Sequence, residues 1–118
     1  MKEFMLIFRR DPSLIDEDQR SPEKMQMLWK AWRDWSSRLT AQNNFGENGK
    51  RLSVDGMVVR PKKPATNGPY VELKETVVGY MFIKANSLQE AAKLAEDCPQ
   101  ISMGGTVEIR PVVSVTGT

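Results

Sequence analysis

The side chains of this sequence that could bind or transfer charge gather around one stretch, a loop expected at 61–75 (PKKPATNGPYVELKE). Arginines end the two runs of strand-forming residues that come before this loop. The candidate ligand-binding residues are Arg9, Arg60, Asn67, Tyr70, Glu72, Lys74 and Glu75. Arg9 and Arg60 could hold a carboxylate or a phosphate, because a guanidinium group presents its donors as a fork. The predicted chemistry is therefore recognition of a small anion.

Glu72 and Glu75 are the catalytic candidates of this set. A buried carboxyl group acquires a raised pKa and can then act as a general acid or base. The alternative is that Glu72, Lys74, Glu75 and the arginines form a network of ion pairs that braces the loop, since such networks are common structural features. Asn67-Gly68-Pro69 suits a turn, because each residue favours a turn for its own reason.

Composition excludes several other chemistries. The 118 residues include no histidine, which removes the commonest general base and transition-metal ligand. No nucleotide-binding glycine motif, CxxC or HExxH motif occurs, so we expect no cofactor and no metal. A net charge of +2 is too small to indicate nucleic acid or an anionic membrane. The single Cys98 is expected to be buried and inert, and it fits a cytoplasmic protein without disulfides.

The elements that must position these residues begin with a strand at 3–10 that is apolar on both faces. Ser21-Pro22 then opens a helix of about five turns. Its core-facing stripe comprises Met25, Leu28, Trp32, Trp35 and Leu39, with Trp29 off the stripe. A second strand is expected near 51–60, with Asp55-Gly56 as a bulge or tight turn inside it.

The second half of the chain is expected to add a strand, a helix and a last strand. Residues 76–85 form the clearest strand, with Val77, Met81 and Ile83 on one face and Val78, Tyr80 and Phe82 on the other. Ser87 and Glu90 form a capping box for a helix that ends at Pro99. A last strand at 106–113 carries charges and Pro111, as an edge strand does.

The order strand–helix–strand–strand–helix–strand predicts an α+β, ferredoxin-like fold over a single domain, 1–118. Right-handed crossovers place the first and third strands at the centre of a four-stranded antiparallel sheet, with both helices on one face. Arg9, Arg60 and Val77 would then share one rim beside the 61–75 loop. The other face of the sheet stays apolar, so a homodimer packed through it is expected, with the loops and tail as the alternative cover.

Long stretches of the chain also resemble the YCII-related family, in particular its DGPF branch. The resemblance rests on NGPYVELKETVVGYMFI at 67–83, LQEAAKLAEDCP at 88–99 and GGTVEIRPV at 104–112, and on FMLIFR and SPEKMQ nearer the start. It implies a dimeric α+β barrel around an interior cleft. Some relatives carry a His–Asp pair suspected of catalysis, but this chain has no histidine, and Asn67 and Tyr70 replace the Asp and Phe of the DGPF motif.

Three functions remain open at this point. The first is a dimeric domain that binds a small molecule in a cleft near the 61–75 loop. The second is an acid–base enzyme that uses Glu72 or Glu75 with an arginine clamp. The third is an accessory protein-binding module linked to transcription, which rests on relatives found beside sigma-factor-type proteins. The missing histidine and the replacement at Asn67 favour binding without catalysis.

Overall fold

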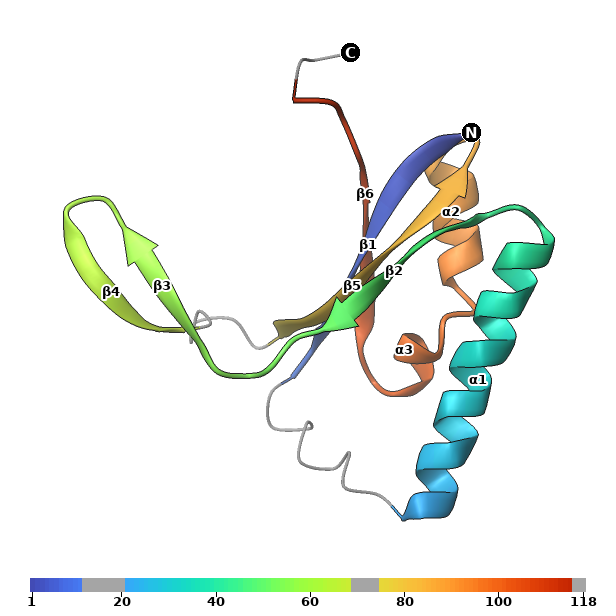
Figure 1. Ribbon diagram of the computed structural model, residues 1–118, viewed down its shortest axis with the longest axis horizontal. Helices are drawn as coiled ribbons and strands as arrows, with labels where there is room; N and C mark the ends of the chain where they lie inside the picture. Colours follow the sequence, from blue (N-terminus) through green and yellow to red (C-terminus); the bar gives the residue numbers. More distant parts are fainter. Residues whose placement is uncertain (12–20, 69–74, 116–118) are drawn as a thin grey trace.

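The computed structural model describes residues 1–11, 21–68 and 75–115. In these residues six strands form a four-stranded and a two-stranded sheet, and three helices accompany them. The elements are β1 (Lys2–Arg10), α1 (Pro22–Ala41), β2 (Phe45–Arg51), β3 (Gly56–Arg60), β4 (Lys63–Gly68), β5 (Thr76–Ala85), α2 (Leu88–Ala95), α3 (Pro99–Ser102) and β6 (Thr106–Pro111). Figure 1 shows the helices on one side of the larger sheet and the β3–β4 hairpin on the other.

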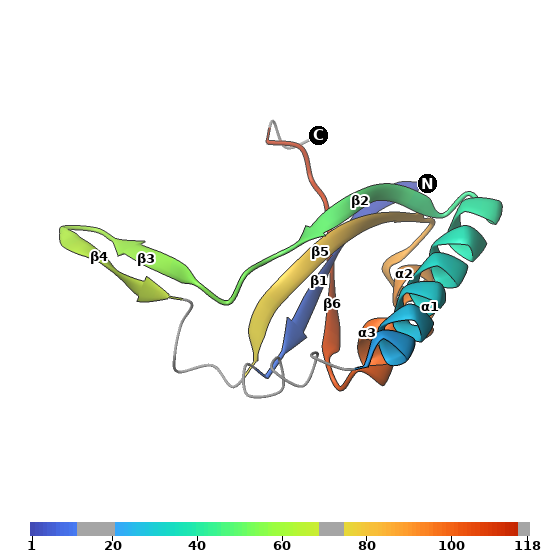
Figure 2. The same cartoon turned by 60° about the horizontal axis from the view of Figure 1, so that its bottom comes forward.

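The larger sheet has the strand order β2-β5-β1-β6, and every neighbouring pair is antiparallel. The expected four-stranded antiparallel sheet is therefore confirmed, with β1 and β5 at its centre. Burial alternates along β1, so that Phe4, Leu6 and Phe8 face the helices and are buried. Met5 and Ile7 lie opposite Phe82 and Tyr80 on the other face, which the described helices leave uncovered (Figure 2).

A bulge in β5 changes which side chains share a face. Phe8 pairs with Gly79 but Arg9 pairs with Val77, so Val78 is an extra residue in the ladder. Val78 consequently packs against the core, whereas Val77 shares the open face with Arg9. The sequence-based faces of this strand were wrong at these two positions, because simple alternation does not anticipate an inserted residue.

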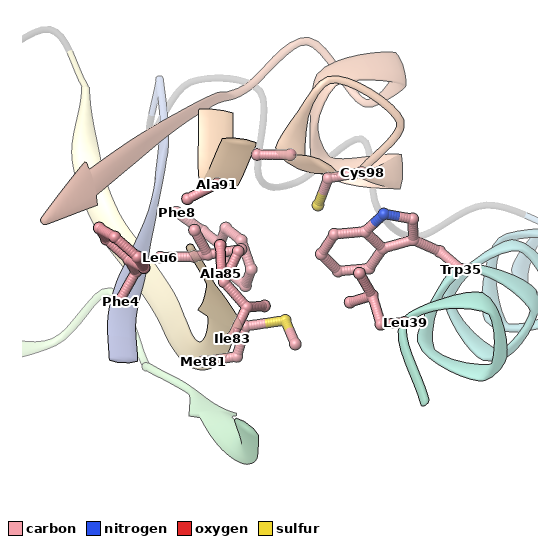
Figure 3. Close-up of a cluster of buried hydrophobic side chains, with 11 residues drawn as sticks. Phe4, Leu6, Phe8, Trp35, Leu39, Met81, Ile83, Ala85, Ala91 and Cys98 are labelled. Atoms are coloured by element: carbon pink, nitrogen blue, oxygen red, sulfur yellow. The ribbon is translucent and has the colours of Figure 1, made fainter. Parts of the chain in front are cut away.

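The core lies between the sheet and the helices (Figure 3). Trp35 and Leu39 fix the C-terminal half of α1 to it, and the Trp35 indole N–H donates to the Leu94 carbonyl oxygen at 3.2 Å. Trp32 packs edge-on against Phe8, with ring centroids 5.4 Å apart. Ala91, Ala95 and Cys98 close the other end of the core, and the expected burial of Cys98 is confirmed.

The second strand of the sheet lies at 45–51, so the prediction of 51–60 was wrong. Asn43 takes a left-handed conformation (φ 62°) and turns the chain back at once after α1. The buried Asn44 then anchors β2, because its side-chain amide donates to the Lys84 carbonyl oxygen at 2.8 Å. Its own carbonyl oxygen accepts from the Lys84 N–H at 2.7 Å. These contacts place a polar segment at the sheet edge.

The segment at 56–68, which we call the arm, is a separate two-stranded sheet made of β3 and β4. Its strands join at Pro61-Lys62, where Lys62 has a φ of 59°. The expected continuous 61–75 loop is thus wrong at 63–68, which is a strand. Residues 52–55 separate β2 from the arm and Gly56 begins β3, so Asp55-Gly56 is not a bulge within one strand.

The helix starts agree with the sequence-based prediction better than the helix ends do. The Ser87 hydroxyl accepts from the Glu90 N–H at 3.1 Å and caps α2. The Ser21 hydroxyl accepts from the Lys24 N–H and caps α1. Glu90 reaches back one residue further than a capping box requires and accepts from the Asn86 N–H at 3.2 Å. The second helix ends at Ala95, and Pro99 begins the short α3 instead of ending α2. The last strand ends at Pro111.

Candidate functional site

A groove of about 500 Å³ lies between the N-terminal half of α1 and the β2–β5 side of the sheet. This volume falls in the range of small-molecule sites, which typically measure about 300–1,000 Å³. The groove opens on the helix side of the sheet, where Arg10, Val78 and Gly79 line it, and none of the predicted site residues that the structure describes is in its lining. It is therefore a site that the sequence-based prediction did not place.

The wall of the groove explains why the predicted helix stripe is not continuous core. Met25 and Leu28 were expected to be buried, but they are only partly buried and line the groove. Trp29 lies one position outside the stripe, lines the same groove and exposes 53% of its surface. Because α1 is fixed at Trp35 and Leu39, its first half stands over β2 without being packed against it.

Aromatic rings give this wall a defined shape. Trp32 is held between Phe8 and Trp35, and the Trp32 and Trp35 centroids are 5.9 Å apart at an interplanar angle of 77°. Trp29 adds a second indole to the wall three residues earlier in the same helix. Indole rings offer a flat apolar face to a ligand ring and can also stack on it. The wall is therefore suited to an aromatic or other flat apolar group.

The charged residues that line the groove are all cationic: Arg10, Arg33, Lys50 and Arg51. No carboxylate lines it among the residues that the structure describes. Arg10 is only 3% exposed and lies deep, on the helix face of β1, whereas the other three are exposed. Within the described part of the chain, no ion pair is formed by Arg33, Lys50 or Arg51. The groove thus combines an apolar wall with a positive potential.

Gly49 brings two of these cations to the groove. A β-carbon at this position would lie 1.6 Å from the Tyr80 carbonyl oxygen, so only glycine allows the backbones of β2 and β5 to approach this closely. The β2–β5 register also shifts between Glu47 and Lys50. The irregular end of β2 carries Lys50 and Arg51 along the groove edge.

The predicted rim is only partly assembled in one chain. Arg9 lies on the open face, and its Nε donates to Glu108 Oε1 at 3.1 Å. Glu75 lies at the same end of the sheet, where its Oε2 accepts from the Thr106 hydroxyl at 3.1 Å, and Thr106 pairs with Arg9. The structure therefore brings Arg9 and Glu75 near one another, each with a partner that the sequence-based analysis did not identify.

Glu108 is the acid that braces Arg9, a role that the alternative interpretation gave to the 61–75 loop. It also accepts from Arg110 at 3.3 Å, and hydrogen bonds from Arg9 and then Arg110 lower the pKa of its carboxyl group. Alternation along β6 could have indicated this pair, because Glu108 lies directly opposite Ile7 on the face that also carries Arg9.

The other predicted site residues do not join this rim. Arg60 ends β3 in the arm, where its Nη1 donates to the Thr66 hydroxyl at 3.3 Å, and Asn67 lies opposite Met57 in the same hairpin. The shared rim of Arg9 and Arg60 is wrong for a single chain, because it required the second strand to end at residue 60. Tyr70, Glu72 and Lys74 lie outside the described residues.

Two further chemistries can be examined in the described ranges. No cluster of three or more potential metal ligands occurs in residues 1–11, 21–68 and 75–115. Burial raises the pKa of the Cys98 thiol to about 12, so little of it is thiolate at neutral pH. None of the helices described is both long and apolar enough to cross a membrane.

A four-stranded antiparallel sheet with its helices on one face, and with an apolar, cationic groove under α1, defines an α+β domain. The model of the YCII-related domain matches residues 3–116, which is nearly the whole chain. The protein therefore belongs to the YCII-related family, as the sequence motifs indicated. No curated protein matches the sequence.

Proposed function

We propose that this domain binds a small apolar anion, of the aromatic carboxylate type, in the groove between α1 and the β2–β5 edge. The observation that carries this proposal is the composition of the groove, which joins indole and thioether side chains to cations without a described carboxylate. The sequence-based prediction of an anionic ligand is kept, but its location moves from the 61–75 loop to the helix side of the sheet.

The two halves of such a ligand would contact different elements. A ring placed against Trp29 and Trp32 would bury on the order of 150 Å² of apolar surface, which corresponds to about 4 kcal/mol before the entropic cost of binding. The carboxylate would lie toward the mouth, where Lys50, Arg51 and Arg33 supply charge-assisted hydrogen bonds. The apolar part sets affinity, and the cations set the preference for an anion.

Titration with three probes tests this division. We expect 1-naphthoate to bind and to quench tryptophan fluorescence, neutral 1-naphthalenemethanol to bind more weakly, and acetate not to bind measurably. Lys50→Gln/Arg51→Gln should weaken naphthoate by about tenfold, the loss expected for one or two charge-assisted hydrogen bonds, and leave the neutral probe unchanged.

The arm supplies the matched control for this test. Lys62→Gln/Lys63→Gln removes the same charge from residues that do not line the groove. Equal naphthoate affinities in the two double variants would overturn the proposal, because the effect would then be one of net charge. Trp29→Ala should weaken both aromatic probes, and failure to do so would place the ring elsewhere.

We also propose that the chain forms a homodimer through the open face of its larger sheet, in a ferredoxin-like arrangement that pairs into an α+β barrel. Two observations support this. The strand order β2-β5-β1-β6 makes β1 parallel to β2 and β5 parallel to β6. The chain connects each parallel pair through a helix, and these helices lie on the same face of the sheet (Figure 1). The centre of the open face carries Met5, Ile7, Tyr80 and Phe82, an apolar surface of the kind that proteins cover, and the ion pairs of Glu108 with Arg9 and Arg110 border it on the β6 side.

Sedimentation measures this pairing directly. The wild-type chain should sediment as a dimer at micromolar concentration, and Met5→Lys should shift it to monomer, because the lysine would be desolvated between Phe82 and Arg110 with no acid directly opposite it. Ile101→Lys is the control, since Ile101 is an exposed isoleucine on α3, in the helix layer. A wild-type monomer, or equal effects of the two substitutions, would contradict the pairing.

A further inference from the structure

We infer that the arm, residues 56–68, packs against a second copy of this chain and holds the dimer together. The inference rests on the homodimer proposed above and adds to it a second contact surface outside the four-stranded sheet. It assigns a role to a described two-stranded sheet that does not pair with the larger sheet.

The surface of the arm is too apolar for a free hairpin. Met57 and Val59 are two residues apart in β3, so their side chains lie on the same side of the strand. They are 67% and 79% exposed. An isolated two-stranded hairpin is at best marginally stable in water, and it needs packing against another surface to persist. Among the described residues the arm pairs only within itself, and we place the surface that covers it on another molecule.

The position of the arm indicates what this surface is. In both views the arm leaves the end of β2 on the side of the sheet opposite the helices (Figures 1 and 2). A molecule that covers Met5, Ile7 and Phe82 on the open face therefore lies beside the arm as well. A second copy related by two-fold symmetry would supply its own open face and its own arm. Each copy would then cover the open face and the arm of the other.

The exposed area of the chain agrees with this. A compact monomer of 13.4 kDa is expected to expose about 6,500 Å². The chain exposes 8546 Å², an excess of about 2,000 Å². This excess is of the same size as the roughly 1,000–2,500 Å² that each partner of an obligate dimer buries. The radius of gyration is 16.0 Å, against about 13.5 Å for a compact chain of this length.

Substitution of the arm tests the inference, and α1 provides a matched control. Met57→Lys/Val59→Lys should raise the dimer dissociation constant by about tenfold or more, because lysines would be desolvated at the contact. Met27→Lys should leave it unchanged, since Met27 is 72% exposed, much as Met57 is, but lies on α1 in the helix layer. Circular dichroism at protein concentrations below the dimer dissociation constant checks that each variant stays folded.

A second measurement does not depend on weakening the dimer. Val59→Cys introduces an exposed thiol, whereas the native Cys98 is 2% exposed and stays unreactive. The rate at which a maleimide modifies residue 59 should fall severalfold as the protein concentration rises through the dimer dissociation constant. The same thiol at Met27→Cys should react at a constant rate.

The possible outcomes separate the two proposals. A wild-type chain that is monomeric at every concentration would overturn both the dimer and the role of the arm. A wild-type dimer with unchanged affinity in Met57→Lys/Val59→Lys, and with constant reactivity at residue 59, would leave the open-face dimer standing and overturn the arm contact alone. In that case the arm would be a surface for a different partner.

Discussion

Replacement of Asn44 by alanine should loosen the edge of the sheet that borders the groove. Asn44 is buried and lies one residue before β2. Its side-chain amide donates to the Lys84 carbonyl oxygen at 2.8 Å and to Glu90 Oε1 at 3.5 Å. Alanine removes this donor but keeps the backbone hydrogen bond from Lys84 to residue 44. The substitution therefore isolates the contribution of one side chain to the placement of β2.

The magnitude of the loss follows from the part-buried position of this hydrogen bond. A net hydrogen bond contributes about 1 kcal/mol, and a carbonyl left dry and unsatisfied costs up to about 3 kcal/mol. Water can reach a sheet edge, so we expect a loss of about 1–2 kcal/mol in the free energy of unfolding. For a domain of this size that loss lowers the melting temperature by about 4–8 °C.

Thermal and urea unfolding, followed by circular dichroism, measure this loss. Asn48→Ala is the control, because Asn48 is exposed on the same strand, and its replacement should change stability by less than about 0.5 kcal/mol. The reasoning is refuted if Asn44→Ala and Asn48→Ala unfold at the same temperature. Hydrogen exchange should also be faster in β2 than in β1 of Asn44→Ala, since β1 keeps both of its neighbours.

Three other perturbations have definite outcomes. Gly49→Ala should lower the melting temperature and weaken naphthoate binding, because the new β-carbon would overlap the Tyr80 carbonyl oxygen at 1.6 Å; normal stability and binding would show that β2 can shift freely. Glu108 has a lowered pKa in the folded chain, so its contribution to stability is complete above about pH 5 and is lost as the pH falls through the lowered value. Urea titrations of wild type and Glu108→Gln should therefore differ at pH 7 and converge in acid, and parallel curves would contradict this. Cys98, whose pKa is raised to about 12 by burial, should react with a thiol reagent only after unfolding, so fast labelling of the native chain would refute its burial.

The central parts of the fold follow from local patterns in the sequence. β1 and β5 are runs of β-branched, aromatic and other apolar residues, and both helices begin at serines whose hydroxyls accept the expected backbone hydrogen bonds. These elements need no information from distant residues. Their correct prediction also placed β1 and β5 at the centre of the sheet.

The edges were not predictable in the same way. FGENGKR has little strand propensity, yet it pairs with β5 because Asn43 turns the chain and Asn44 anchors it. The more strand-like MVVR segment was assigned to the sheet, whereas it belongs to the arm. Backbone pairing and one buried amide outweigh propensity here, and neither can be seen in a local window. The error then moved Arg60 to a rim where the chain does not place it.

The groove was missed because its wall has the spacing of a core stripe. Met25 and Leu28 continue the pattern of Trp35 and Leu39, and the pattern does not reveal where the partner surface ends. Trp29 was the available signal, since it widens the apolar face of the helix at its N-terminal half. The end of β2 that faces this half offers Asn48, Gly49, Lys50 and Arg51, and these residues, with Leu52 and Val54 after them, line the space beneath the two indoles without filling it.

Substitutions in the two halves of α1 have different consequences, because the C-terminal half is packed in the core and the N-terminal half lines the groove. Changes at Trp35 or Leu39 act on folding, because these side chains are buried between the layers. Changes at Met25, Leu28 or Trp29 alter the shape of an open recess and leave those layers intact. Relatives with this architecture could thus diverge in what they hold while preserving the same scaffold, by exchanging a few side chains within two turns.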